Sequence, residues 1–261
     1  MPPRIPTPSD FTSLSLTLSL HPPSPPESTT TFLLLLHGLG DNEAPFLSFA
    51  KNLNLPNVYA ISIRGVNPLP PALLGLPLDS GPTHHFHWGD DIRLSGEGLD
   101  PDPGFHKAER LVLGGLVRDV LVQKLGWEVE DVLVFGFGQG GSLALGLAAR
   151  LAGGGRVEEV KEGEGNGDKG KRFKGVVSVG GGMVASMSGG LGGAKKAKTP
   201  VLVCHGRDSE VLDEEGVEVV RDMFEDVREV RWKKADDGMP RIREEVVPLM
   251  EFFAERLRSG W

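Results

Sequence analysis

The chain has 261 residues, of which 39% are hydrophobic, so it is long enough to bury one sizeable core. Acidic residues outnumber basic ones by 36 to 28, which gives a net charge of −8 and argues against a nucleic-acid partner. The longest apolar run near the N-terminus, Phe32 to Leu36, is far too short to cross a membrane.

Two features of the sequence bear on the cellular compartment. Met1-Pro-Pro-Arg-Ile-Pro6 lacks the basic and then apolar order of a secretory signal. The only cysteine is Cys204, so no disulfide can form within the chain, as is typical of proteins in a reducing compartment. We therefore expect a soluble, cytoplasmic protein.

Hydrophobic spacing divides the chain into alternating strands and helices. Strands are expected where apolar residues alternate or run continuously, and helices where they recur at helical spacing. The predicted strands cover residues 14–20, 32–36, 58–63, 132–137, 176–179, 201–205 and 229–232. The predicted helices cover residues 44–55, 104–125, 142–151, 214–224 and 241–258. This alternation predicts an α/β fold, with a mostly parallel central sheet flanked by helices on both faces, as a single domain over residues 1–261.

Three segments between these elements are expected to be irregular. The first, residues 66–82, is rich in Pro, Leu and Gly and is expected to form an ordered loop or lid. Five of its leucines are candidates to line or cover a pocket: Leu69, Leu73, Leu74, Leu76 and Leu78. The second, residues 153–172, combines glycines with alternating charges and is expected to be a flexible surface insertion. The third is a Gly/Lys loop over residues 186–198.

The most informative segment runs from the strand at Val132 into the helix after Gly141. It contains Gly136-Phe-Gly-Gln-Gly140 at the turn between the two. A strand, a sharp turn and a helix with the pattern Gly-x-Ser-x-Gly form a nucleophile elbow, in which the serine stands at the tip. Here Gly138 takes the serine's place, and glycine adopts the positive φ of such a tip without a Cβ penalty. The sequence predicts the turn without its nucleophile.

A second donor to such a site is expected from His37-Gly-Leu-Gly-Asp41, directly after a predicted strand. The backbone N–H groups of Leu39 and of Gln139, the residue after the elbow tip, are the candidate pair for an oxyanion hole. Two converging amides stabilise a developing negative charge on oxygen, whatever the side chains are. His37 and Trp88 are candidate ligand-binding residues near these amides.

The remaining groups of a Ser-Asp-His triad would lie later in the chain. Asp208 follows the strand that ends at His205 and is the candidate acid, although an aspartate after a strand is commonly a turn residue. The triad order requires a histidine after the acid, and no histidine follows His205. Pro240 or, in better agreement, Arg241 stands at the base position, and an arginine stays protonated and cannot act as a base. Arg241 is a candidate ion-pair partner of Asp208.

Other side chains are candidates to replace the missing nucleophile or base. Ser142 lies within the first turns of the helix, where capping or packing is the favoured role. His84-His-Phe-His87, with Asp90 and Asp91, is the only histidine cluster and could hold a transition metal at His84, His85 and His87. His85 and His87 would share a face of an extended segment, but no clear third ligand is specified, and a polar pocket rim or lid loop is favoured. Cys204 ends an apolar strand and is expected to be an inert buried thiol. No phosphate- or dinucleotide-binding motif is present, and no cofactor is expected.

Several motifs together resemble the phospholipase/carboxylesterase family of α/β hydrolases, which includes the acyl-protein thioesterases. The similar segments are His37-Gly-Leu-Gly-Asp41, Trp88-Gly-Asp90, Asp102-Pro-Gly-Phe105, Gly136-Phe-Gly-Gln-Gly-Gly141, His205-Gly-Arg-Asp208 and Gly238-Met-Pro-Arg241. The resemblance implies an α/β-hydrolase fold and hydrolysis of carboxylic esters and thioesters. It places the family's serine at Gly138, its aspartate at or beside Asp208 and its histidine at Arg241.

Three hypotheses follow. The first is a catalytically impaired hydrolase fold that binds an acyl, carboxylate or protein ligand. The second is an ester or thioester hydrolase that uses a non-standard nucleophile, base or metal. The third is a scaffold subunit that uses the fold only as a surface, as the Pro/Leu segment 66–82 would suggest.

Overall fold

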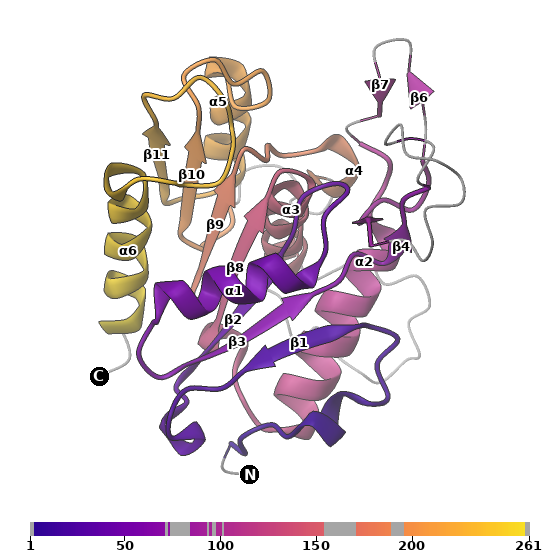
Figure 1. The fold of residues 1–261 in the computed structure, drawn as a ribbon, viewed down its shortest axis with the longest axis vertical. Coiled ribbons are helices and arrows are strands. Elements are labelled where there is room, and N and C mark those ends of the chain that lie inside the picture. Colours follow the sequence, from indigo (N-terminus) through magenta and orange to yellow (C-terminus); the bar gives the residue numbers. More distant parts are fainter. Residues whose placement is uncertain are drawn as a thin grey trace.

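A computed structural model of the chain describes residues 3–70, 73, 84–92, 94, 95, 98–100, 102–153, 171–188 and 196–258. Its centre is a seven-stranded sheet in the order β1-β3-β2-β8-β9-β10-β11 (Figure 1). The strands are β1 (Leu18–His21), β2 (Thr31–Leu36), β3 (Val58–Ile63), β8 (Val132–Phe137), β9 (Gly175–Val179), β10 (Val201–His205) and β11 (Val227–Arg231). β1 pairs antiparallel with β3 at one edge, and the other pairs are parallel. The predicted α/β class is confirmed.

Helices pack on both faces of this sheet (Figure 1). They are α1 (Glu43–Leu53), α2 (His106–Glu109), η4 (Arg110–Lys124), α3 (Gln139–Gly153), α4 (Ala185–Ser188), α5 (Glu214–Met223) and α6 (Arg243–Arg258). The α2 and η4 segments follow each other directly, and η4 has the wider turns of a π-helix. Two two-stranded pairs lie outside the sheet: β4 (Asn67–Pro68) with β5 (Phe86–His87), and β6 (Leu94–Ser95) with β7 (Gly98–Leu99). Three short 3-10 helices, η1 (Pro8–Phe11), η2 (Pro26–Ser28) and η5 (Val129–Asp131), complete the described elements.

The core lies in two layers that the side-chain alternation of the strands creates. In β2, Phe32, Leu34 and Leu36 face the layer formed with η4, α3 and α5. Leu33 and Leu35 face the opposite layer, formed with α1 and α6. Every residue of β2 is buried because both faces of a parallel sheet are covered. The continuous apolar run in the sequence has this double burial as its cause.

Several expected boundaries shift. The first strand begins at Leu18 rather than at residue 14, and the strand expected over 229–232 is β11, two residues earlier at its start. Part of the Gly/Lys loop expected over 186–198 is the short helix α4. The segment 154–170, which contains most of the expected insertion, lies outside the described residues, as do Leu74, Leu76 and Leu78. Leu69 is fully buried and Leu73 is exposed.

In the described part of the chain, no helix combines the length and the apolarity needed to span a membrane. The carboxyl ends of the parallel strands meet at one edge of the sheet, which in this class of fold is where ligands bind. The loops after β2, β8, β9, β10 and β11 all begin there. That edge therefore contains the candidate site.

Candidate functional site

The turn between β8 and α3 has the geometry of a nucleophile elbow. Gly138, at its tip, has a φ of +51°, in the left-handed region. Its N–H donates to the Val179 carbonyl at 2.8 Å, and its own carbonyl accepts from the amides of Gly141 at 2.8 Å and Ser142 at 3.1 Å. Strand β8 and helix α3 therefore meet at a backbone conformation that favours glycine but does not require it.

The glycines around the tip differ from Gly138 in what a side chain would meet. A Cβ added to Gly136 would lie 2.1 Å from the Gly140 carbonyl oxygen, and one added to Gly140 would lie 2.3 Å from the Leu36 carbonyl oxygen. At Gly138 the nearest atom would be the Gly38 Cα, at 3.9 Å. Packing excludes a side chain at the two flanking positions, whereas the tip has room for one. The absence of a side chain at Gly138 is thus not a packing requirement.

The loop after β2 is held by His37, which is fully buried. Its Nε2 accepts from the Gly65 amide at 2.7 Å, and its Nδ1 lies 2.7 Å from the Gly38 carbonyl oxygen. Because the Gly65 amide can only donate and the carbonyl can only accept, this geometry selects the neutral ring with its proton on Nδ1. Burial lowers the pKa of His37, in agreement with a neutral ring. His37 therefore fixes the loop from beneath.

Trp88 joins this loop to the start of α3. Its indole N–H donates to the His37 carbonyl at 2.8 Å, and its backbone N–H donates to the Gln139 side-chain Oε1 at 2.8 Å. The Trp88 side chain is fully buried, and its ring centroid lies 5.1 Å from that of His37. Both candidate ligand-binding residues thus lie under the site as its support. Their contacts in the structure are with the protein itself.

The two candidate oxyanion amides belong to Leu39 and Gln139. Among the described residues, no acceptor receives a hydrogen bond from either amide, whereas the neighbouring Gly40 amide donates to the Phe86 carbonyl at 2.9 Å. The loop of Leu39 lies against the elbow, since Gly38 is the nearest neighbour of the open position at Gly138. The fold thus brings a loop amide and a helix N-terminal amide to the same turn. Such a pair can bind a negatively charged or polarised oxygen.

The expected ion pair between Asp208 and Arg241 is wrong. The Asp208 side chain is 59% exposed, and Arg207 binds it through Nε at 3.0 Å and Nη2 at 3.2 Å. This contact lowers the pKa of Asp208. Arg241 is exposed, and its backbone amide donates to the Glu245 carboxylate at 2.7 Å. An adjacent arginine satisfies Asp208 locally, so its carboxylate has no need of a partner from the other loop.

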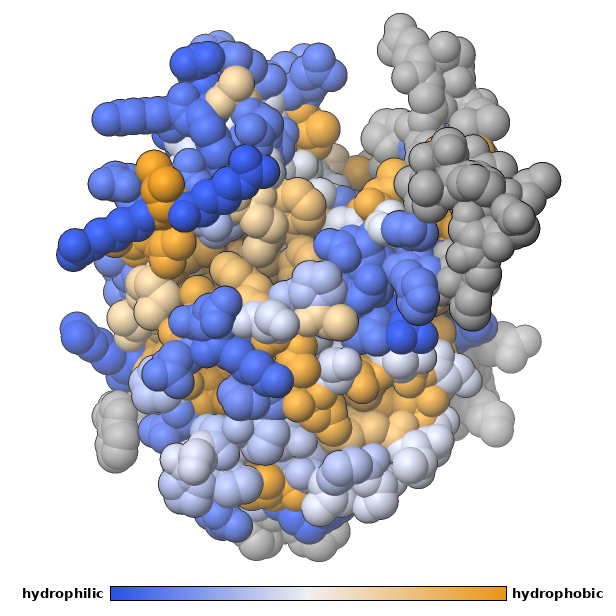
Figure 2. All heavy atoms as spheres, viewed as in Figure 1, coloured by the Kyte–Doolittle hydropathy of each residue, from blue (hydrophilic) through white to orange (hydrophobic). Residues whose placement is uncertain are grey.

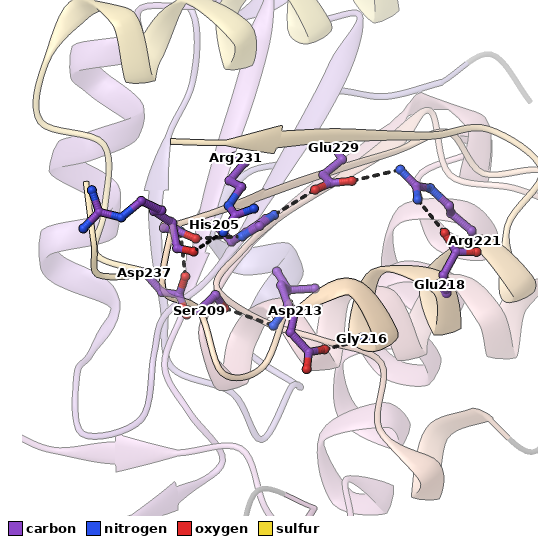
Figure 3. Close-up of polar contacts among 12 residues, drawn as sticks. His205, Ser209, Asp213, Gly216, Glu218, Arg221, Glu229, Arg231 and Asp237 are labelled. Carbon is purple, nitrogen blue, oxygen red and sulfur yellow. Dashed lines mark hydrogen bonds and ion pairs between the residues drawn. The ribbon is translucent and has the colours of Figure 1, made fainter. Parts of the chain in front are cut away.

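A different carboxylate, that of Asp237, joins the loops after β10 and β11 (Figure 3). Its Oδ1 accepts from the Gly206 amide at 2.8 Å, and its Oδ2 accepts from the Ser209 hydroxyl at 2.7 Å. The Ser209 oxygen in turn accepts from the Leu212 amide at 3.0 Å. The sequence does not single out Asp237, because the residue beside it, Asp236, is also an aspartate. In the structure Asp236 makes an ordinary turn contact instead, with the Gly238 amide at 2.7 Å.

The candidate replacements for the missing nucleophile and base do not come together in one reactive site. His84 is exposed, the His85 ring contacts the Gly40 carbonyl at 2.7 Å, and His87 is buried. Over the described residues, no three His, Cys, Asp or Glu side chains are placed to hold a metal ion. Burial raises the pKa of Cys204, which keeps its thiol protonated and unreactive. Ser142 is buried at the start of α3.

A separate cavity of about 430 Å³ lies between α5 and the strands β10 and β11. In it, His205 Nε2 lies 3.2 Å from the Glu229 carboxylate, whose other oxygen accepts from Arg221 at 2.9 Å, and Arg221 also binds Glu218 (Figure 3). The surface around α5 is mostly hydrophilic (Figure 2). These charges pair with one another, and Ser209, whose hydroxyl binds Asp237, also lines the cavity.

Comparison with known proteins places these features in a family context. The profile of the phospholipase/carboxylesterase family matches residues 23–154, which is half of the chain. An uncharacterized hydrolase of Schizosaccharomyces pombe is 35% identical over 122 residues, which are 46% of this chain and 46% of that protein. One from Mycosarcoma maydis is 34% identical over 126 residues, 47% of this chain and 43% of that protein. The matched stretch thus spans less than half of each curated relative.

Solved structures extend the likeness of fold to nearly the whole chain. Acyl-protein thioesterase 2 of Zea mays is similar with a TM-score of 0.65 at 19% identity, over 92% of this chain and 99% of that one. The esterase PE8 is similar with a TM-score of 0.66 at 18% identity, over 93% of this chain and 99% of that one. At these identities the likeness shows the α/β-hydrolase fold.

Proposed function

Because the chain belongs to the phospholipase/carboxylesterase family, we propose that it is a hydrolase-fold protein that binds an acyl or carboxylate ligand without efficient catalysis. The observation that carries the proposal is the elbow tip. Gly138 has the backbone conformation of the nucleophile position and open space for a side chain, yet it offers no hydroxyl. A serine mechanism needs that oxygen as its nucleophile.

The loss of the base supports the same conclusion. No histidine follows His205 in the sequence, and the motif resemblance places the family's histidine at Arg241. A guanidinium remains protonated at neutral pH and cannot accept the nucleophile's proton. The absence of both groups removes bond cleavage by the usual route, while leaving the binding elements in place.

The amides of Leu39 and Gln139 support ligand binding at the same position. Each lacks a hydrogen-bond partner within the described residues, although other loop amides beside them are paired. A carboxylate or acyl carbonyl oxygen would satisfy both. Exposed apolar side chains on the loops after β2, β10 and β11, namely Leu39, Val211 and Ile242, suit an attached hydrocarbon chain.

The test combines turnover with binding. Purified protein is assayed against acyl esters and thioesters from two to sixteen carbons, and medium-chain carboxylates are titrated while amide NMR shifts are recorded. We expect no turnover above the buffer rate, and saturable shifts at Leu39 and Gln139. Arg228→Ala, near the start of β11 and so toward the opposite edge of the sheet, serves as the control that leaves binding unchanged. Efficient ester turnover would refute the proposal, as would the absence of binding to every chain length.

Two finer expectations belong with this proposal. A protein is the second class of ligand that the exposed apolar side chains of Leu39, Val211 and Ile242 could bind. A cytoplasmic location is supported by the use of a single cysteine, Cys204, which is buried.

A further inference from the structure

We propose that Asp237, and not Asp208, occupies the acid position of the elbow site. A triad acid accepts a hydrogen bond from the base and is itself held in place by neighbouring donors. Asp237 is held in this way by the Gly206 amide and the Ser209 hydroxyl, at 2.8 Å and 2.7 Å. Both donors lie in the loop after β10, where the family motif places the acid, while Asp237 itself comes from the loop after β11. The carboxylate is thus supplied from the neighbouring loop.

Asp208 lacks the features that this role requires. Its carboxylate is bound on both oxygens by Arg207, and 59% of its side chain is exposed to water. Its backbone amide donates to the Ala235 carbonyl at 3.1 Å, which fixes the chain while the side chain points away to Arg207. A carboxylate saturated by an arginine in solvent contributes little to orienting a base.

The backbone around Asp237 connects it to the elbow. A Cβ added to Gly180 would lie 2.7 Å from the Asp237 Cβ, so the two residues are in direct contact. Gly180 follows Val179, whose carbonyl accepts the hydrogen bond from the Gly138 amide. A Cβ added to Gly181 would lie 2.4 Å from the Gly138 carbonyl oxygen. The turn after β9 therefore touches the elbow tip on one side and Asp237 on the other.

The side chain at position 241 turns back toward the same region. A Cβ added to Gly238, the residue after Asp237, would lie 2.5 Å from Oδ1 of Asp236 and 3.4 Å from Nη2 of Arg241. An imidazole at position 241 would start from the same loop as Asp236 and Asp237, whereas Asp208 lies in the loop after β10. Of the two carboxylates in this loop, that of Asp237 is the one held toward the loop after β10, by Gly206 and Ser209. The site would then have kept its acid while losing its nucleophile and its base. This inference rests on the proposed function only in placing the site at the elbow.

The test introduces the missing base as a reporter. In Arg241→His, the imidazole of the new residue is followed by NMR from pH 5 to pH 9, its signals identified as those absent from the unmodified protein. A carboxylate neighbour favours the protonated ring and raises its pKa. We expect Asp237→Asn, added to Arg241→His, to weaken proton binding by the new imidazole about tenfold. The matched controls, Asp208→Asn and Asp236→Asn in the same background, are each expected to change it less than twofold.

Two results would overturn the assignment: an effect of Asp208→Asn or of Asp236→Asn as large as that expected for Asp237→Asn, or no effect of Asp237→Asn. If Asp237→Asn does not fold, Ser209→Ala replaces it, because it removes one donor to the carboxylate and leaves the charge. It should alter proton binding by the imidazole measurably, and an unchanged titration would contradict the proposal. This readout needs no enzyme activity, so it is independent of whether the unmodified protein proves to be a hydrolase.

Discussion

The Gly65 amide donates a hydrogen bond to Nε2 of His37 at 2.7 Å, and this contact makes the loop of the proposed oxyanion amides dependent on a neutral histidine. A proton on Nε2 would face the Gly65 N–H, so that neither group could be satisfied. The loop geometry and the charge of His37 are therefore coupled.

This coupling predicts a loss of stability in mild acid. Burial lowers the pKa of His37 below its ordinary value of 6.5, so the unfolded chain takes up the proton first. The contribution of His37 is then fully present above pH 6.5 and declines as the pH falls below it. Urea unfolding between pH 8 and pH 5 should show this decline. His87, whose pKa burial and Lys107 also lower, contributes in the same direction.

The control is His37→Phe. It leaves the Gly65 amide without its partner and should lower the free energy of unfolding at pH 8 by about 2 kcal/mol. It should also reduce the pH dependence below pH 6.5. A variant with the same pH dependence as the unmodified protein would show that another group causes the decline.

The glycines of the elbow should differ in their tolerance of alanine. Gly138→Ala should cost about 1–2 kcal/mol, because a residue with a Cβ is strained at this φ but meets no close atom. Gly136→Ala, with backbone oxygen 2.1 Å from the new Cβ, should cost more than about 3 kcal/mol or prevent folding. Chemical denaturation of the two variants measures the difference, and equal losses would contradict the elbow geometry.

Restoring the nucleophile alone should not restore a reaction. Gly138→Ser supplies a hydroxyl at a strained position, but Arg241 cannot take its proton. We expect no acyl-ester turnover from this variant, and weak turnover only when Arg241→His is added. A Gly138→Ser chain as active as the double variant would show that a base is already present.

The ion pair between Arg4 and Asp10, near the N-terminus, leads to a prediction about stability away from the site. Asp10 is buried, and Arg4 binds both of its carboxylate oxygens, at 2.6 Å and 2.9 Å. Arg4 holds the pKa of Asp10 well below its ordinary value of 3.8, so this contribution is present above that pH and is lost as the pH falls through the acid range. Asp10→Asn should cost about 2 kcal/mol at pH 7 in urea unfolding. Asp222→Asn, at an exposed position of α5, should cost much less.

The fold and the elbow could be predicted because their signals are local. The continuous apolar run at β2 and the glycine spacing after β8 each reflect constraints of a single segment, namely burial on both faces and close backbone contact. The residues adjacent to Gly138 in the sequence predict its place at the tip of the elbow, and its φ of +51° agrees with that place. Such features need no knowledge of what packs against the segment from elsewhere.

The acid position could not be predicted because it depends on contacts between distant loops. Asp208 matched the motif, but the arginine beside it in the sequence, Arg207, satisfies its charge. Asp236 and Asp237 are equivalent in sequence, and only the positions of Gly206 and Ser209, about 30 residues earlier, distinguish them. The different environments of His84, His85 and His87 are likewise set by the loop around Gly40 and by burial.

The central claim is that this member of the family lacks a reactive nucleophile at its elbow. Intact-mass spectrometry of the unmodified protein after incubation with a fluorophosphonate probe tests it most directly. We predict no mass increase under conditions that label an active serine hydrolase completely. Stoichiometric addition of one probe, mapped by peptide sequencing to the elbow or to Ser142 in α3, would contradict the account.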